Sequence, residues 1–134
     1  MNASTSSSKT ALWTGRVLTA LCALFLLLDG VAKLFKPAVV VQGTVDLGYP
    51  ASTITGMGLA LVAGVVLHLI PRTAVLGALL VTAYLGGAVA THVRVENPLF
   101  SHVLFPTYLA IMLWAGLGLR RPAIRALLLR PDRT

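Results

Sequence analysis

Eight polar or ionisable residues are candidate site residues because they lie in or beside long apolar stretches of the chain. They are Asp29, Lys33, Tyr84, His92, Arg94, Glu96, His102 and Tyr108. Asp29 and Lys33 are four residues apart, a spacing that places both side chains on one face of a helix, where they can pair. Ionisable groups are costly inside a membrane, so residues of this kind indicate a functional site by default.

Three kinds of site could use these side chains, and the sequence leaves all three open. The first is a charge-neutralised cap, in which Asp29 pairs with Lys33 or Arg94, Glu96 pairs with Arg94 and the histidines contact interfacial water. The second is a binding site for a quinone head group, a small anion or a proton. A quinone carbonyl needs a hydrogen-bond donor beside an apolar groove, and His or Tyr in a helix bundle supplies one. The third is a metal site of two histidines and a carboxylate, although the spacing matches no recognised ligand pattern.

The composition indicates an integral membrane protein. The 134 residues are 57% hydrophobic and only 11% charged, whereas a soluble domain carries about 25% charged residues. Disorder, coiled coils and nucleic-acid binding also require more charge, so we expect no nucleic-acid partner. A single cysteine excludes a disulfide framework. No G-x-S-x-G, H-E-x-x-H, C-x-x-C or P-loop motif is present, so the sequence identifies no enzyme and favours a chain without activity of its own.

Hydropathy and helix-stop signals predict an all-α, integral membrane four-helix bundle in a single domain over residues 13–119. A membrane-spanning helix takes about 20 residues, and Pro and Gly divide the chain into segments of that size. The expected spans are residues 13–35, 53–70, 73–93 and 100–119. Residues 1–12 form a polar N-terminal tail and residues 36–52 the longest connection. Residues 120–134 form a basic cytoplasmic tail, with a short helix that we expect to contact anionic lipid.

The distribution of Lys and Arg predicts the orientation. If the N-terminus is cytoplasmic, that side holds Lys9, Arg16, Arg72, Arg120, Arg121, Arg125, Arg130 and Arg133. The opposite side then holds only Lys33, Lys36 and Arg94. The positive-inside rule therefore places both termini in the cytoplasm. We expect a multi-pass protein of the bacterial inner membrane, with the lipid bilayer as its first partner.

Small residues at every fourth position predict how two of the spans pack. The third span carries Ala74, Ala78, Thr82, Gly86 and Ala90, and the second carries Gly56, Ala60 and Gly64. Small side chains let membrane helices approach closely. The turn between these spans is short, so we expect the two stripes to face each other within a hairpin. The same faces could instead contact a membrane protein partner or a second copy of this chain.

The sequence resembles the DoxX-like family of small bacterial membrane proteins. The resemblance is carried by LIPRTAVLGALLVTAYLGGAVATHVR (residues 69–94), supported by DGVAKL (29–34), LGYP (47–50), NPLF (97–100), LFP (104–106) and the segment from Leu113-Trp114 to Leu119-Arg120. It covers roughly residues 13–129 and implies a four-helix integral membrane protein. Relatives often carry Lys or Glu in the second span, where this chain has only His68.

The resemblance implies a function only in outline, because most members have no assigned activity. The family is named after a small membrane subunit of a thiosulfate:quinone oxidoreductase. Together with the eight candidate residues, the name favours a quinone-linked accessory subunit of a membrane redox complex. The alternative is a non-enzymatic membrane assembly factor, a partner-binding bundle or a small-solute permeation element. Quinone is the cofactor that this reading allows, and haem or a metal ion is the weaker option.

Overall fold

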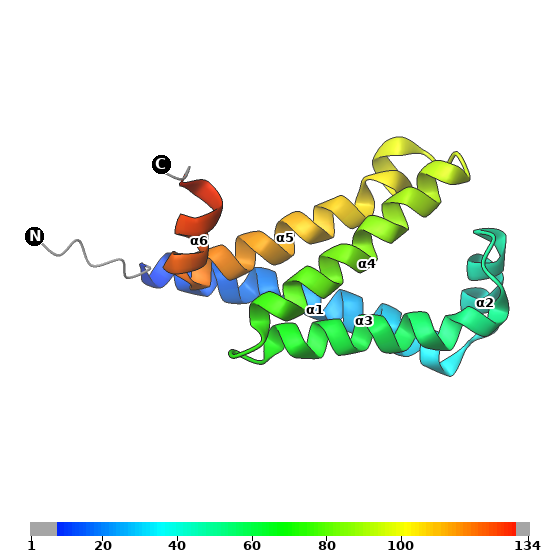
Figure 1. The fold of residues 1–134 in the computed structure, drawn as a ribbon, viewed down its shortest axis with the longest axis horizontal. Coiled ribbons are helices and arrows are strands. Elements are labelled where there is room, and N and C mark those ends of the chain that lie inside the picture. Colours follow the sequence, from blue (N-terminus) through cyan, green and yellow to red (C-terminus); the bar gives the residue numbers. More distant parts are fainter. Residues whose placement is uncertain (1–7, 131–134) are drawn as a thin grey trace, which may run out of the picture.

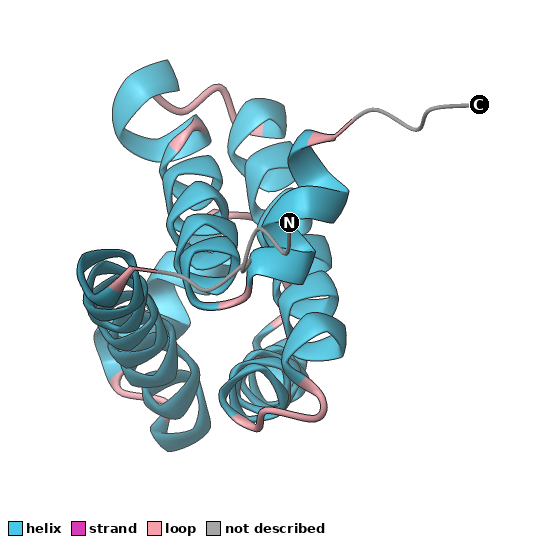
Figure 2. Cartoon of the chain, turned by 90° about the vertical axis from the view of Figure 1, so that its left-hand side faces the viewer, coloured by secondary structure: helices cyan, strands magenta, loops and turns pink. Residues whose placement is uncertain are grey.

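The computed structural model describes residues 8–130, and all regular structure within that range is helical (Figures 1 and 2). The elements are α1 (Lys9–Phe35), α2 (Ala38–Asp46), η1 (Ala51–Thr53), α3 (Ile54–Leu69), α4 (Ala74–Arg94), η2 (Leu99–Val103), α5 (Phe105–Arg120) and α6 (Pro122–Leu129). Four helical segments of the described chain are long and apolar enough to cross a membrane: Lys9–Phe35, Ala51–Leu69, Ala74–Arg94 and Leu99–Arg120. The protein is therefore a multi-pass membrane protein embedded in a lipid bilayer.

Local signals explain where the helices begin. α1 starts four residues before Trp13 because the Ser8 hydroxyl accepts a hydrogen bond from the Ala11 amide at 3.1 Å and caps the first turn. Short helical turns, η1 and η2, extend α3 and α5 at their N-termini. The connection expected at residues 36–52 contains a helix, α2, which starts directly after Pro37. With 9 residues it is too short to span a bilayer.

α3 and α4 form a hairpin that is tight at its turn and open at its far end (Figure 1). A Cβ atom on Gly77 would lie only 2.1 Å from the backbone nitrogen of His68, and one on Gly64 would lie 3.0 Å from the Val81 side chain. At the far end, a Cβ atom on Gly56 or Gly86 would meet nothing within 4 Å.

This divergence corrects the prediction that the two small-residue stripes face each other within the hairpin. Ala74 and Ala78 are buried near the turn, but Gly56, Ala60, Gly86 and Ala90 are exposed on the outside of the bundle. The second-span stripe meets α4 through Gly64, whose neighbour is Val81. The sequence pattern could not show this, because the crossing of two helices depends on every neighbour that packs against them.

Away from this turn, the close backbone approaches between helices are made by α1. A Cβ atom on Gly58 of α3 would lie 2.8 Å from the Gly30 carbonyl oxygen, and one on Gly15 would lie 2.9 Å from the Gly116 carbonyl oxygen of α5. α1 therefore packs against α5 through Gly15 near its start and against α3 through Gly30 near its end, as expected where lipid provides no hydrophobic drive for helix association.

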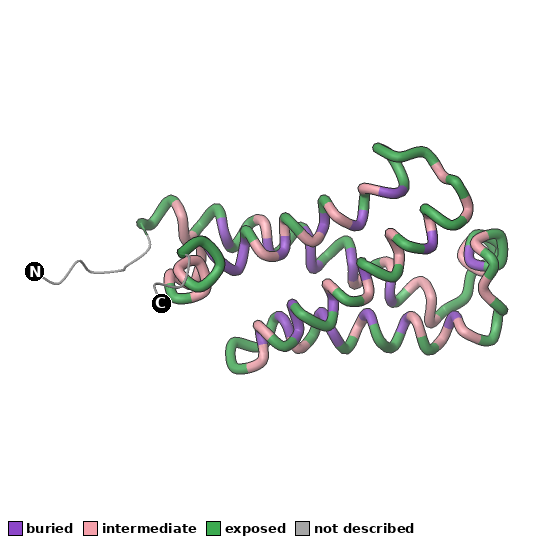
Figure 3. The backbone as a smooth tube through the Cα atoms, turned by 45° about the horizontal axis from the view of Figure 1, so that its top comes forward, coloured by how far each residue is buried: buried purple, intermediate pink, exposed green. Residues whose placement is uncertain are grey.

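The core lies along the axis of the bundle, where buried positions of the long helices face one another (Figure 3). Leu61, Leu113 and Leu117 are fully or almost fully buried. α4 and α5 are joined by a hydrogen bond of 2.8 Å from the Trp114 indole nitrogen to the Thr82 hydroxyl. α6 crosses the end of α5 (Figure 1), and the junction is held by an Arg121 guanidinium that donates to the Pro71 carbonyl in the α3–α4 turn.

Candidate ligand-binding cavity

A cavity of about 510 Å³ lies at the open end of the α3–α4 hairpin, lined by residues of α1 to α5. Small-molecule sites typically measure about 300–1,000 Å³. Its polar lining residues are Asp29, Lys33, Thr44, Tyr49, Tyr84, Thr91 and His92. Its larger apolar lining residues are Phe25, Leu26, Leu47, Met57, Leu85, Phe105, Pro106 and Leu109. The cavity thus combines a polar cluster with an apolar wall.

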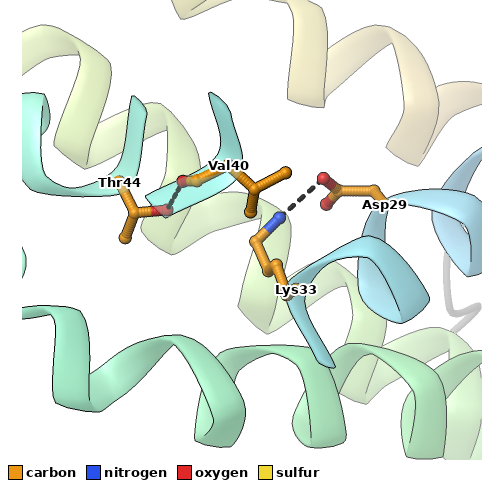
Figure 4. A network of polar contacts seen from close by, with 4 residues as sticks. All are labelled: Asp29, Lys33, Val40 and Thr44. Carbon is orange, nitrogen blue, oxygen red and sulfur yellow. Dashed lines mark hydrogen bonds and ion pairs between the residues drawn. The ribbon is translucent and has the colours of Figure 1, made fainter. Parts of the chain in front are cut away.

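Asp29 and Lys33 form an ion pair on the last turns of α1, with 2.6 Å between the Lys33 amine and the Asp29 carboxylate (Figure 4). The Lys33 side chain is 13% exposed and the Asp29 side chain 43% exposed. The predicted four-residue pairing is therefore present in the structure. The pair cancels its own charge, yet an ammonium group has three N–H donors and this ion pair uses one.

Tyr49 and Thr91 are joined by a hydrogen bond of 2.6 Å between their hydroxyl oxygens. The Thr91 hydroxyl donates its one proton to the Gly87 carbonyl of the preceding turn at 2.9 Å. Thr91 therefore accepts from Tyr49, and the lone pairs of the Tyr49 oxygen stay available. Thr44 of α2 donates to the Val40 carbonyl at 2.8 Å, so its own oxygen keeps acceptor capacity as well (Figure 4).

His92 lines the cavity with its tautomer set by a neighbour. The Asn97 amide nitrogen is a donor and lies 2.7 Å from Nδ1 of His92, so Nδ1 accepts. The neutral ring then carries its proton on Nε2, which is a free donor. Tyr84 lies two turns earlier on α4 and also lines the cavity.

These groups favour one class of ligand. The Lys33 amine, the Tyr84 hydroxyl and the Nε2–H of His92 supply donors, while the Asp29–Lys33 pair leaves little net charge. A neutral molecule with carbonyl oxygens on a polar head and an apolar remainder matches this lining.

Four of the eight predicted residues are brought together here, namely Asp29, Lys33, Tyr84 and His92. The structure places the other four outside the cavity lining. Arg94 donates to the Leu47 carbonyl and packs over Gly48, and Glu96 is exposed just after α4. Tyr108 is 45% exposed and donates to the Phe100 carbonyl at 3.1 Å.

His102 is exposed, and its Nδ1 lies 2.8 Å from the Ser101 hydroxyl. Its ring meets that of His92 edge to face, with 5.8 Å between centroids. Within residues 8–130, no group of three or more His, Cys, Asp or Glu side chains is arranged to hold a metal ion.

Tyr49, Thr91 and Thr44 are cavity residues that the sequence analysis did not select. A signal for Thr91 was present, because residues 84, 87, 88 and 91 recur at the spacing of one helix face. Tyr49 carried no comparable signal. It belongs to an irregular connection, whose place against α4 depends on how the chain folds back.

The family assignment agrees with this arrangement. The sequence pattern of the DoxX-like family matches residues 17–116. The chain belongs to the DoxX-like family. In this DoxX-like protein the cavity lining runs from Phe25 to Leu109, so the whole cavity lies in the part of the chain that the family shares. No curated protein and no solved structure matches the chain.

Proposed function

We propose that this DoxX-like protein binds a quinone-type molecule in the cavity and acts as an accessory subunit of a membrane redox complex. The observation that carries the proposal is the position of the donors Lys33, Tyr84 and His92 beside an apolar wall in a membrane-embedded bundle. A quinone has carbonyl oxygens that accept hydrogen bonds and an apolar tail that partitions into lipid. The sequence carries no recognised catalytic motif, so the proposal assigns the chain a binding role and no reaction of its own.

The exposed small residues of the hairpin favour a second candidate, a non-enzymatic bundle that binds a membrane partner or a second copy. Gly56 and Gly86 have open space above them, and a small groove of about 160 Å³ passes Gly86 between α4 and α5. Surfaces of this kind allow close approach of another membrane helix. An assembly factor would use such a surface without any ligand, and a permeation element would use the cavity without retaining one.

The orientation belongs to the same proposal. The start of α1, the α3–α4 turn and α6 lie at one end of the bundle (Figure 1), and Lys9, Arg16, Arg72, Arg120 and Arg121 come with them. We infer that this end faces the cytoplasm of a bacterial inner membrane, since basic residues are retained on that side. The cavity then opens toward the outer half of the bilayer.

Co-purification of quinone tests the ligand. The protein would be purified from bacterial membranes in a mild detergent, and the extracted quinone would be quantified per mole of protein. We expect Tyr84→Phe and His92→Ala to lower the retained quinone. Tyr108→Phe is the matched control for Tyr84→Phe, because it makes the same chemical change outside the cavity lining, and it should retain the quinone.

Two results would contradict the quinone proposal: wild-type protein without quinone above the level of bulk lipid, or equal loss in cavity and control variants. Proteins that co-purify with wild type would then identify the partner of a non-enzymatic bundle. A redox enzyme among them, with quinone present, would support the accessory role.

A further inference from the structure

A second polar cluster lies at the opposite end of the bundle from the cavity, where α5 ends. Arg120 is the last residue of α5, and its side chain crosses α1 at Gly15. A Cβ atom on Gly15 would lie 2.8 Å from Cγ of Arg120. The absence of a side chain at Gly15 therefore lets the guanidinium turn toward the bundle.

Two atoms of this guanidinium are buried without a hydrogen-bond partner, namely Nε and Nη2 of Arg120. They are the parallel donors on one edge of the group, which is the geometry that binds a phosphate or carboxylate through two hydrogen bonds. Arginine stays charged in proteins, so loss of a proton does not remove the free-energy cost of these unpartnered donors. Buried N–H donors of a charged group require an acceptor.

The surroundings of Arg120 supply positive charge and no negatively charged acceptor. Arg16 of α1 and Arg121 lie within electrostatic reach of Arg120. His68 of α3 lies within electrostatic reach of both Arg120 and Arg121. His68 is 2% exposed, and its Nδ1 donates to the Ala74 carbonyl at 2.9 Å. The neutral ring therefore presents Nε2 as an acceptor, and that atom is also buried without a partner.

No carboxylate of the described residues is placed to neutralise this cluster. Asp29 pairs with Lys33, Asp46 accepts from the Gln42 amide at 2.7 Å, and Glu96 follows α4. All three acids belong to the cavity end of the bundle. None of these three acids is therefore a counterion of the cluster.

We propose that the cluster of Arg120, Arg121, Arg16 and His68 binds the phosphate group of an anionic phospholipid. Arg120 also ends a membrane-spanning segment, Leu99–Arg120, and thus lies at the level of lipid head groups. Its free edge binds two phosphate oxygens. A head group with a hydroxyl, such as phosphatidylglycerol, can in addition donate to Nε2 of His68, so that all the unused atoms of Arg120 and His68 find partners.

α6 supports a lipid source rather than a soluble anion. It follows Arg121 directly, and its last turn exposes Leu127, Leu128 and Leu129. Arg125 lies within α6, and Arg130 follows directly after its end. A short helix with exposed leucines and nearby arginines at this level fits the interface of an anionic leaflet. The lipid that Arg120 holds would then lie beside a helix that is itself in contact with lipid.

Lipid retention measured by native mass spectrometry tests the proposal on the full chain. Protein from nanodiscs of mixed phosphatidylglycerol and phosphatidylcholine should retain phosphatidylglycerol preferentially. We expect Arg120→Gln to reduce that preference about tenfold, since hydrogen bonds to charged groups are among the strong ones. Arg72→Gln is the matched control, because Arg72 is exposed in the turn at the same end and its loss removes the same charge. Arg120→Lys keeps the charge but lacks the two parallel donors of the guanidinium, and it should also lose the preference for phosphatidylglycerol.

Three further arms decide the outcome. Equal loss in Arg120→Gln and Arg72→Gln would overturn the site in favour of general surface charge. Stabilisation of lipid-free protein in detergent by inorganic phosphate, to the same extent as by phosphatidylglycerol, would overturn the lipid source. Retention of phosphatidylglycerol no greater than that of phosphatidylcholine in wild-type protein would overturn the proposal as a whole. If Arg120→Gln does not fold, Arg16→Gln should show a reduced preference in its place.

Discussion

Tyr49 donates a hydrogen bond of 2.6 Å to Thr91, and this contact fixes the connection before α3 against the last turns of α4. Two residues earlier, the Leu47 carbonyl accepts from Arg94. The backbone at Gly48 has φ +88°, a conformation that favours glycine, and the Arg94 guanidinium packs against it. The connection therefore has two attachments to α4, and it forms one wall of the cavity.

The first prediction concerns the Tyr49 hydroxyl. Tyr49→Phe removes the bond to Thr91 and should lower the free energy of unfolding by about 1 kcal/mol. It should also speed hydrogen exchange in residues 38–53, because the connection loses an attachment. Tyr108→Phe is the control, since it removes an exposed hydroxyl bond on another surface. Equal exchange in the two variants would show that the Tyr49 hydroxyl does not hold this wall.

The second prediction compares two glycines of α3. Gly58→Ala would place Cβ 2.8 Å from the Gly30 carbonyl oxygen, a backbone atom that cannot move alone. Overpacking of this kind costs about 1–3 kcal/mol. Gly56→Ala meets nothing within 4 Å and should be tolerated. Thermal unfolding in detergent would measure both, and a stable Gly58→Ala would contradict the α1–α3 contact.

The third prediction is an asymmetry within the Asp29–Lys33 pair. Lys33 is 13% exposed and Asp29 43% exposed, so the lysine depends more on its partner. Asp29→Asn leaves the more buried charge unpaired and should destabilise the protein more than Lys33→Gln. In the double variant the loss should be smaller than the sum, with a coupling of about 0.5–3 kcal/mol. Additive losses would mean that the pair contributes nothing to stability.

The fourth prediction is the orientation. Cys22 is buried in α1 and can be replaced by Ala to give a background free of cysteine. In that background, a membrane-impermeant thiol reagent should label Glu96→Cys from outside intact cells and should label Arg125→Cys only after permeabilisation. The reverse pattern would invert the bundle and place the cavity toward the cytoplasm.

Hydropathy and the positions of Pro and Gly were enough to predict four membrane helices, because a span needs only length and apolar composition. Local spacing was also enough to predict that Asp29 and Lys33 can pair, since residues four apart share a helix face, and the structure chose Lys33 over Arg94 as the partner.

Tertiary structure decided which residues line the cavity. The divergence of α3 from α4 turned the far half of both small-residue stripes outward and opened the space that Tyr84 and His92 line. The fold of the irregular connection brought Tyr49 to Thr91, 42 positions apart in sequence. Such contacts depend on crossing angles and on the path of a connection. Both follow from packing among all the helices, whereas periodicity within one helix reports only which residues share a face.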